Sequence, residues 1–282
     1  ILIVAEPDFP EPGVSAWINA HCHITRAGTK QVCCEQLSFH LRGPTSQLLP
    51  SIVFAHLDSD LPLYFWWQGE WSGEVNLTHI KWIDRLIFDS AAWHEPVSQF
   101  HTLRELSKAL RSPERLCDLN WTRSSAMRLA VAHLFDHPTV LENREEIRSV
   151  EITHGPTDGV QARLLAGWLA ALLNWCFVER VGERFVFQKR SGSSLFVQFT
   201  SQDEEGIRAI EICTPSATVR AEQGEKSSLI QTSIVIGSYP PLTDFMPAGK
   251  SGLLETLRAE LATGGRHRVY RKAVDVMHPH WI

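Results

Sequence analysis

The sequence predicts an α/β first domain, residues 1–123, followed by an α+β second domain, residues 124–282, whose antiparallel β-meander packs on helices. In the first half, apolar strand-like runs alternate with helix-like stretches, which is the pattern of an open α/β sheet. In the second half, a strongly apolar helix precedes short alternating runs at close intervals, and these are typical of an antiparallel meander. The pattern changes between Arg111 and Gly155, and we place the domain boundary after Arg123.

The first half opens with an apolar run, and the proline-rich residues 7–13 then interrupt regular structure. Residues 31–42 alternate apolar and polar side chains, as a half-buried strand does. Thr45 or Ser46 can cap the helix that follows the turn at Gly43. The expected elements are strands at 1–5, 31–42, 61–71 and 85–90, and helices at 14–21, 45–57 and 97–110.

Residues 61–71 form the most informative apolar run, Leu-Pro-Leu-Tyr-Phe-Trp-Trp-Gln-Gly-Glu-Trp. The run is too short for a membrane span, which needs about 20 apolar residues. A short unbroken apolar run bounded by turn residues indicates a strand that is buried on both faces. Because Trp66 and Trp67 would point to opposite faces of such a strand, we expect a layer of structure on each side.

The second half contains one strongly apolar helix, whose Leu and Trp side chains recur at helical spacing. Turn residues separate the short alternating runs that follow this helix. The last helix opens at Ser251 or Gly252, and Gly264 and Gly265 are expected to end it. The expected elements are helices at 124–135, 160–175 and 252–262, and strands at 184–189, 195–200, 207–213, 218–222 and 229–236.

The formal net charge of −5 and the pI of about 6.2 argue against a nucleic-acid-binding protein, which usually carries a basic patch. The apolar runs are too short to cross a membrane, so we expect no membrane association and a cytoplasmic protein. The chain begins at Ile1 rather than Met and lacks the features of a signal peptide, so we expect a fragment without its upstream segment. The scattered spacing of the six cysteines predicts reduced thiols.

The sequence predicts neither a metal site nor a cofactor. His133 and His137 would face one side of a helix, but a leucine follows the first histidine where a zinc protease has glutamate. The ligand-like residues 21–23 and 278–280 have no second half-site. The adjacent Cys33 and Cys34 would point to opposite faces of a strand and rarely bond each other, so a structural role is expected.

Catalytic motifs are missing from the sequence, which has no glycine-rich phosphate loop and no nucleophile elbow. Four aspartates lie near strand ends, where α/β enzymes keep catalytic groups, but nothing pairs them with a nucleophile or a base. We therefore expect these aspartates to act as caps and turn residues. They are Asp58, Asp60, Asp84 and Asp89.

Residues 118–123, Asp-Leu-Asn-Trp-Thr-Arg, stand directly before a predicted helix. One interpretation is an N-terminal cap made by Thr122 or Ser124, with Trp121 packed beneath it. The other is a polar and aromatic contact patch, because Arg and Trp dominate protein interfaces. The sequence leaves both interpretations open.

Five segments are specific when they are taken together. They are LPSIV at 49–53, DLPLYFWWQGE at 60–70, DRLIFDS at 84–90, DLNWTR at 118–123 and ARLLAGWL at 162–169. With these segments, in the family's order, the chain resembles the OpcA family of glucose-6-phosphate dehydrogenase assembly proteins of cyanobacteria and actinobacteria. The resemblance covers about residues 20–175, and residues 33–36 look more like the cyanobacterial members.

The resemblance implies a non-catalytic activator that binds glucose-6-phosphate dehydrogenase, promotes its active oligomer and raises its apparent affinity for sugar phosphate. It also implies thioredoxin as a second partner in cyanobacteria. The candidate contacts with the dehydrogenase are Trp71, Trp121 and Arg123. Cys213, at an exposable strand end, is the candidate regulatory thiol, and Cys176 would have to meet it in space to form a disulfide.

Two other classes of function stay open. An enzyme of sugar-phosphate metabolism would have its site at the strand ends near Asp58 and Asp89, with Arg85 and Arg123 lining a deep pocket. A carbohydrate-binding module would instead use an exposed tryptophan, either Trp71 or Trp93.

Overall fold

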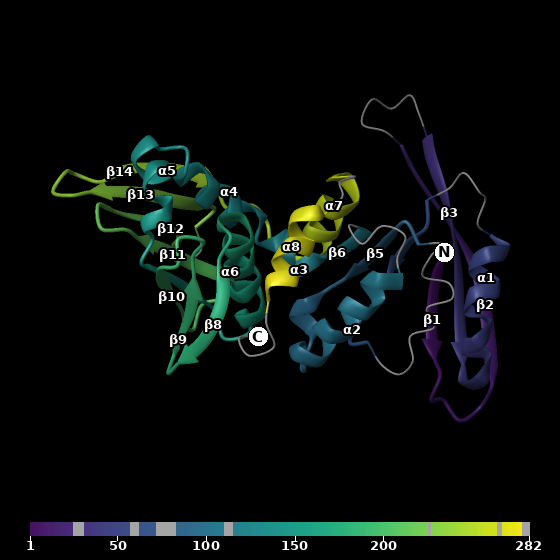
Figure 1. Ribbon diagram of the computed structural model, residues 1–282. Helices are drawn as coiled ribbons and strands as arrows, with labels where there is room; N and C mark the ends of the chain where they lie inside the picture. Colours follow the sequence, from purple (N-terminus) through teal and green to yellow (C-terminus); the bar gives the residue numbers. More distant parts are fainter. Residues whose placement is uncertain are drawn as a thin grey trace. The chain divides into compact units, whose positions relative to one another are not determined.

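The computed structural model describes residues 1–24, 31–56, 62–71, 83–109, 115–224, 227–263 and 267–277. The chain divides into two compact units, Ile1–Leu63 and Tyr64–Ile282, and each is described by itself (Figure 1). Mixed α/β content with a large sheet rich in antiparallel pairs agrees with the expected fold class. The expected division of the chain after Arg123 stays a prediction.

The first unit is a three-stranded sheet of β1 (Leu2–Glu6), β3 (Gln31–Arg42) and β2 (Gly13–Ile24), with β3 in the centre. A 3-10 helix (Gly43–Leu48) and α1 (Leu49–Ala55) follow β3, so the predicted helix is present, although it begins as a 3-10 turn. The helix predicted at 14–21 is wrong, because these residues pair antiparallel with β3, as Ile18 does with Leu37. Their β-branched and aromatic side chains favour a strand.

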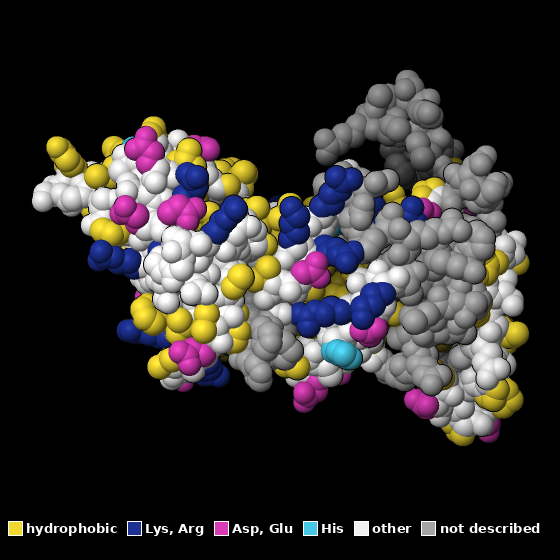
Figure 2. Space-filling model, in the orientation of Figure 1, with side chains coloured by type: hydrophobic (Ala, Val, Ile, Leu, Met, Phe, Trp, Pro, Cys, Tyr) yellow, Lys and Arg dark blue, Asp and Glu magenta, His cyan; other side chains and the backbone are white. Residues whose placement is uncertain are grey.

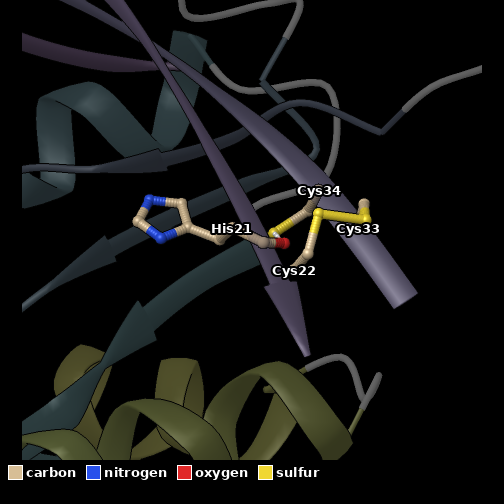
Figure 3. Close-up of a disulfide and its surroundings, with 4 residues drawn as sticks. All are labelled: His21, Cys22, Cys33 and Cys34. Atoms are coloured by element: carbon tan, nitrogen blue, oxygen red, sulfur yellow. Dashed lines mark hydrogen bonds between the residues drawn. A yellow bond between two sulfur atoms is a disulfide. The ribbon is translucent and has the colours of Figure 1, made fainter. Parts of the chain in front are cut away.

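Cys22 and Cys33 lie directly opposite each other in the β2–β3 pair and form a disulfide (Figure 3). The expectation of six reduced thiols is therefore wrong. Only the pairing of two long strands brings these cysteines together, and the spacing of 11 residues does not reveal it. The thiol of Cys34 points toward the other face and donates to the carbonyl oxygen of His21 at 3.6 Å. Because Cys22 is bonded to sulfur, it offers no thiolate for a metal.

The second unit opens with a parallel sheet of β4 (Tyr64–Trp66), β5 (Arg85–Phe88) and β6 (Leu116–Asp118). The predicted aromatic strand is only three residues long, and its Tyr64 and Trp66 are exposed. The prediction of a strand buried on both faces is therefore wrong for β4, because this strand forms an edge of the sheet. The central strand β5 is the one whose four residues are all buried.

Aromatic side chains fill the core around the parallel sheet, next to α2 (Pro96–Ala109), as its periodicity predicted. Phe88 stacks on Trp93 with ring centroids 5.6 Å apart, and Trp71 meets Phe88 edge-on at 5.5 Å. Phe100 and Tyr270 extend the cluster at 5.0 Å from Trp93 and 6.5 Å from Phe88. Rings in these offset and edge-on arrangements add attraction to the area that they bury.

The large sheet has the strand order β14-β13-β12-β11-β7-β10-β9-β8, and only β7 and β10 run parallel. Its strands are β7 (Ser149–His154), β8 (Cys176–Val181), β9 (Arg184–Gln188), β10 (Ser194–Ser201), β11 (Ile207–Cys213), β12 (Ala217–Gln223), β13 (Leu229–Ile236) and β14 (Leu242–Pro247). The predicted strands of the meander are confirmed. The sequence prediction missed β7, β8 and β14, and the insertion of β7 between β10 and β11 breaks the simple meander.

Helices α4 (Ser125–Leu134), α5 (Pro138–Glu142) and α6 (Gly159–Leu173) contact this sheet and bury the apolar side chains of alternating positions, such as Ile152 and Ile210. Glu151 and Glu211 occupy the alternate positions and are not buried. On the face shown in Figure 2, acidic and basic side chains are interspersed over this sheet. The described part of the sheet therefore shows no broad patch of one sign in this view.

The chain ends with α7 (Leu253–Thr263), which was predicted, and α8 (Arg268–Val276), which was not. Helix α8 packs closely on α6, because a Cβ at Gly167 would lie 2.8 Å from the carbonyl oxygen of Ala273. The glycines predicted to end α7 lie outside the described residues. Among the helices that the structure describes, none has the length and apolar character needed to cross a membrane.

Candidate functional site

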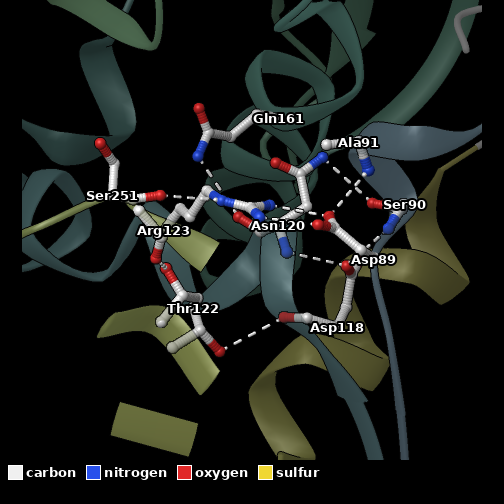
Figure 4. Close-up of polar contacts among 11 residues, drawn as sticks. Asp89, Ser90, Ala91, Asp118, Asn120, Thr122, Arg123, Gln161 and Ser251 are labelled. Carbon is white, nitrogen blue, oxygen red and sulfur yellow. Dashed lines mark hydrogen bonds and ion pairs between the residues drawn. The ribbon is translucent and has the colours of Figure 1, made fainter. Parts of the chain in front are cut away.

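Polar side chains from the ends of β5 and β6 meet at one edge of the parallel sheet (Figure 4). Asp89 follows β5, and Asp118 ends β6 and begins α3 (Leu119–Arg123). The carboxyl ends of parallel strands lie at the same edge of a sheet, which is where α/β proteins place their ligands. This edge is therefore the first place to look for a site.

Asp118 is fully buried, and its carboxylate accepts three hydrogen bonds. Its Oδ1 accepts from the backbone N–H groups of Ser90 and Asn120, both at 3.0 Å, and its Oδ2 accepts from the Tyr270 hydroxyl at 3.1 Å. Burial raises the pKa of Asp118 to about 6. The carboxylate caps α3 and connects the loop after β5 to α8. The cap predicted at Thr122 or Ser124 is therefore wrong in its residue, because Asp118 caps α3 and the Ser124 side chain makes no capping hydrogen bond at the start of α4.

Asp89 and Arg123 form a two-pronged ion pair, with Nη1 to Oδ1 at 2.7 Å and Nη2 to Oδ2 at 2.6 Å. The Nε of Arg123 donates to the carbonyl oxygen of Ser251 at 3.2 Å. Asp89 also accepts from the N–H of Ala91, which caps a short 3-10 helix. The predicted capping role of Asp89 is confirmed, and Arg123 holds the loop after β14 against α3.

The tryptophans singled out by the sequence lie inside the protein. Trp121 is 4% exposed, and the guanidinium carbon of Arg128 lies 3.5 Å from its ring centroid. Trp71 and Trp93 are each 6% exposed in the aromatic core. A carbohydrate-binding module would need an exposed tryptophan at position 71 or 93. This expectation is wrong for both residues. The dehydrogenase contacts proposed for Trp71 and Trp121 stay a prediction, but their burial leaves them little surface to offer.

A cavity of about 600 Å³ lies beside Arg123, at one end of the large sheet. The N-terminus of α6, the turn from β10 to β11 and the segment after β14 form its walls. The lining residues are Arg123, Ser124, Met127, Asp158, Gln161, Glu204, Glu205, Gly206, Ile207, Arg208, Gln223, Ile230, Ala248, Gly249 and Ser251. No sequence pattern pointed to this cavity, because segments far apart along the chain contribute to it.

The enzyme hypothesis grouped Asp58, Asp89, Arg85 and Arg123 around one pocket. Of these residues, Arg123 lines the cavity, whereas Asp58 lies outside the described residues. Arg85 is buried and donates to the carbonyl oxygen of Glu260 at 2.9 Å. In the described part of the chain, the grouping expected for an enzyme is not assembled.

Cys117, Glu260 and His267 place one sulfur, one oxygen and one nitrogen atom within 4.8 Å of one another, as a metal site would. Glu260 already accepts from Thr122 at 2.8 Å, pairs with His267 at 2.7 Å and lies 3.5 Å from the Arg85 guanidinium. Burial, and then the charge of Glu260, raise the pKa of the Cys117 thiol well above its usual range. We interpret the group as a buried ion network, because Arg85 supplies the positive charge.

The remaining candidate ligands and thiols are scattered. His133 is half exposed and pairs with Asp136 and Asp244 at 3.4 and 3.5 Å. Cys213 on β11 and Cys176 on β8 are separated by three strands, which at about 4.8 Å per strand places them about 19 Å apart. These two thiols therefore do not meet in this structure, and their role as regulatory thiols stays a prediction. The histidines at 278–280 lie outside the described residues.

Two family models match the chain. One, described as the glucose-6-phosphate dehydrogenase subunit N-terminal domain, matches residues 1–105, and the other, the corresponding C-terminal domain, matches residues 114–274. The putative OxPP cycle protein OpcA of Synechocystis sp. is 26% identical over 224 residues, 78% of this chain and 45% of that protein. The protein of the same name from Nostoc punctiforme is 29% identical over 216 residues, 74% of this chain and 44% of that protein. The chain thus spans less than half the length of these curated relatives.

Among solved structures, a putative oxidoreductase from Yersinia pestis has a TM-score of 0.43 and 12% identity, covering 81% of this chain and 77% of its own. The putative oxidoreductase yvaA from Bacillus subtilis has a TM-score of 0.41 and 10% identity, with 75% of both chains covered. Because these TM-scores are below 0.5, the two structures support no conclusion about the fold or function of this chain.

Proposed function

We propose, from the premise that this chain belongs to the OpcA family of glucose-6-phosphate dehydrogenase assembly proteins, that it binds the dehydrogenase and raises its activity without chemistry of its own. The observation that carries the proposal is the match of the two family models over residues 1–105 and 114–274. The proposal places the chain in the cytoplasm and in the oxidative pentose phosphate pathway.

The geometry of the polar edge supports a binding role. A catalytic carboxylate needs free lone pairs directed at a substrate and a partner that exchanges protons with it. The carboxylate of Asp118 accepts three hydrogen bonds within the protein, and both oxygens of Asp89 are held by Arg123. These two carboxylates act as structural connectors, which suits a protein whose task is to present a surface.

An activator of this kind works by binding one state of its partner better than another. It shifts the partner's equilibrium only by its difference in affinity for the two states. A complete shift, from 1:99 to 99:1, needs a preference of about 10⁴-fold, and a partial shift needs less. The proposed preference is for the active oligomer of the dehydrogenase over its inactive form.

Arg123 is the candidate contact that retains some exposure, and its ion pair with Asp89 fixes the direction of its side chain. Sensitivity to thiol redox state, with thioredoxin as a second partner, is also part of the proposal. Cys34 and Cys176 are exposed thiols, and Cys22–Cys33 is a disulfide that a dithiol could reduce. Reduction of this disulfide would free the β2–β3 pair from its covalent link.

Steady-state kinetics of the cognate dehydrogenase test the proposal. Adding the purified chain should lower the apparent KM for glucose 6-phosphate in a saturable way, and the chain alone should turn over no sugar phosphate. An albumin of equal concentration is the control for nonspecific protection. Unchanged kinetics at a saturating amount of the chain, or turnover by the chain alone, would contradict the proposal.

A further inference from the structure

The cavity beside α6 contains a buried polar atom without a partner. Gln161 is 4% exposed, and its Nε2 donates to the carbonyl oxygen of Asn120 at 3.3 Å (Figure 4). Its Oε1 accepts no hydrogen bond from the described residues. Buried polar atoms in native proteins nearly always have a partner, which can be water or a ligand. Oε1 itself is fully buried, so a donor in the cavity that Gln161 lines would reach it only after the side-chain amide turns toward that cavity.

The rest of the lining offers donors and acceptors close together. Each terminal nitrogen of Arg123 uses one N–H on Asp89 and keeps a second one. The Oδ2 of Asp158 accepts from the N–H of Gly206 at 2.7 Å, which leaves Oδ1 available among the described contacts, and the side chain of Asp158 does not cap α6. A hydroxyl group both donates and accepts, so it fits a wall on which the two kinds of group alternate.

The charge of the lining disfavours an anion. Two guanidinium groups, of Arg123 and Arg208, face the three carboxylates of Asp158, Glu204 and Glu205, which leaves one excess negative charge. Both guanidinium groups are already paired, Arg123 with Asp89 and Arg208 with Glu204 at 2.8 Å. Among the described lining residues, a phosphate would meet no unpaired cation, and the excess charge would repel it.

The size of the cavity sets the remaining limit. Small-molecule sites in proteins are about 300–1,000 Å³, so 600 Å³ accommodates a monosaccharide with its water. None of the described lining residues is aromatic, so the ring stacking that strengthens many sugar sites is missing. Binding would thus depend on hydrogen bonds alone and would be weak.

We propose that this cavity binds an uncharged polyhydroxy compound of monosaccharide size, with Gln161 Oε1 accepting from one hydroxyl and the guanidinium of Arg123 donating to another. This site is independent of the proposed association with the dehydrogenase, and it is tested on the chain alone.

Saturation-transfer NMR on the purified 282-residue chain tests the proposal with D-glucose, myo-inositol, glucose 6-phosphate and spermidine as separate probes. We expect the two uncharged polyols to bind saturably and glucose 6-phosphate to bind at least tenfold more weakly. Absence of transfer to both polyols would overturn the proposal. Equal or tighter binding of glucose 6-phosphate would overturn its charge argument, and tighter binding of spermidine than of either polyol would replace the proposed site with a cation site.

Two variants locate the site. Gln161→Met removes the orphan oxygen at similar volume and should weaken polyol binding about threefold to tenfold, the value of one hydrogen bond. Gln231→Met, at an exposed position of β13 and not itself a lining residue, is the matched control and should bind as the parent does. Equal binding by the two variants at an unchanged melting temperature would contradict the role of Gln161.

A charge reversal at an exposed position of the lining tests the charge argument. Glu205 is exposed, and Glu205→Lys gives the lining three cations against two carboxylates. This variant should gain at least tenfold in affinity for glucose 6-phosphate while its affinity for D-glucose changes less than threefold. An unchanged affinity for the phosphate would show that the lining charge does not set selectivity, and the proposal would then be wrong.

Discussion

Replacing the buried carboxylate of Asp118 by an amide should change how stability depends on pH. Asp118→Asn keeps an oxygen for the N–H groups of Ser90 and Asn120, and its amide N–H can donate to the Tyr270 hydroxyl. Burial raises the pKa of Asp118 from 3.8 to about 6. A raised pKa in the folded state means that this group's contribution is fully present below pH 3.8 and is lost as the pH rises through 6.

The magnitude follows from the shift. About two pKa units correspond to about 3 kcal/mol, at 1.36 kcal/mol per unit. Of this amount, about 2 kcal/mol falls between pH 4.5 and 7, because part of the transition lies below pH 4.5. The parent should therefore lose about 2 kcal/mol of stability relative to Asp118→Asn across this range, whatever constant offset the substitution adds.

Urea unfolding followed by tryptophan fluorescence at several pH values from 4.5 to 7 measures this difference. Asp203→Asn, at an exposed position of the turn between β10 and β11, is the matched control. Its free energy of unfolding should change with pH in the same way as that of the parent. Parallel curves for the parent and Asp118→Asn would refute the reasoning, because they would show that the buried carboxyl titrates as it does in the unfolded chain. If the parent instead gained stability relative to Asp118→Asn as the pH rose from 4.5 to 7, the predicted direction of the effect would be wrong.

Three further sets of substitutions test the packing, the ion pair and the disulfide. Gly167→Ala should destabilise the chain by about 1–3 kcal/mol, measured by urea unfolding, because its new Cβ would meet the backbone of α8 at 2.8 Å. Arg123→Ala should lower the free energy of unfolding by about 2 kcal/mol in the same assay. This is below the range for a fully buried ion pair, because the Arg123 side chain is 16% exposed. Arg123→Lys should recover only part of the loss. The double variant Cys22→Ser, Cys33→Ser should lose about 3 kcal/mol of local stability in β2 and β3, measured by hydrogen exchange, and dithiothreitol should have the same effect on the parent and none on the variant.

The sequence predicts well those elements that are set by a local repeat of apolar side chains. Strand β11 and helix α6 follow from their periods of 2 and 3.6, and α6 contacts β7 and β10 of the sheet to which β11 belongs. The residues of β2 mix strand-favouring side chains with small and polar ones and show no clear alternation, so pairing with β3 over 12 positions decides that they form a strand. The same long-range pairing forms the disulfide, so both features were beyond local patterns.

Some features of the candidate site could likewise be predicted from neighbouring residues, and others could not. The presence of a cap near residues 118–123 and the packing of Trp121 could be predicted, because a cap and the residues beneath it are neighbours in sequence. The capping residue was misplaced, because Asp118 caps a short helix, α3, that the sequence analysis did not separate from α4. The aromatic run of β4 was misjudged, because apolar content does not reveal whether a strand is central or at an edge. The cavity beside α6 could not be predicted, since Gln161 and Arg208 come together only through the order of strands in the large sheet.

Sedimentation velocity of the cognate dehydrogenase, alone and with increasing amounts of this chain, tests the central claim most directly. If the chain binds the active oligomer in preference to smaller forms, one faster boundary containing both proteins should grow at the expense of the smaller dehydrogenase species. Two boundaries that keep the positions and amounts of the separate proteins at every ratio would contradict the account.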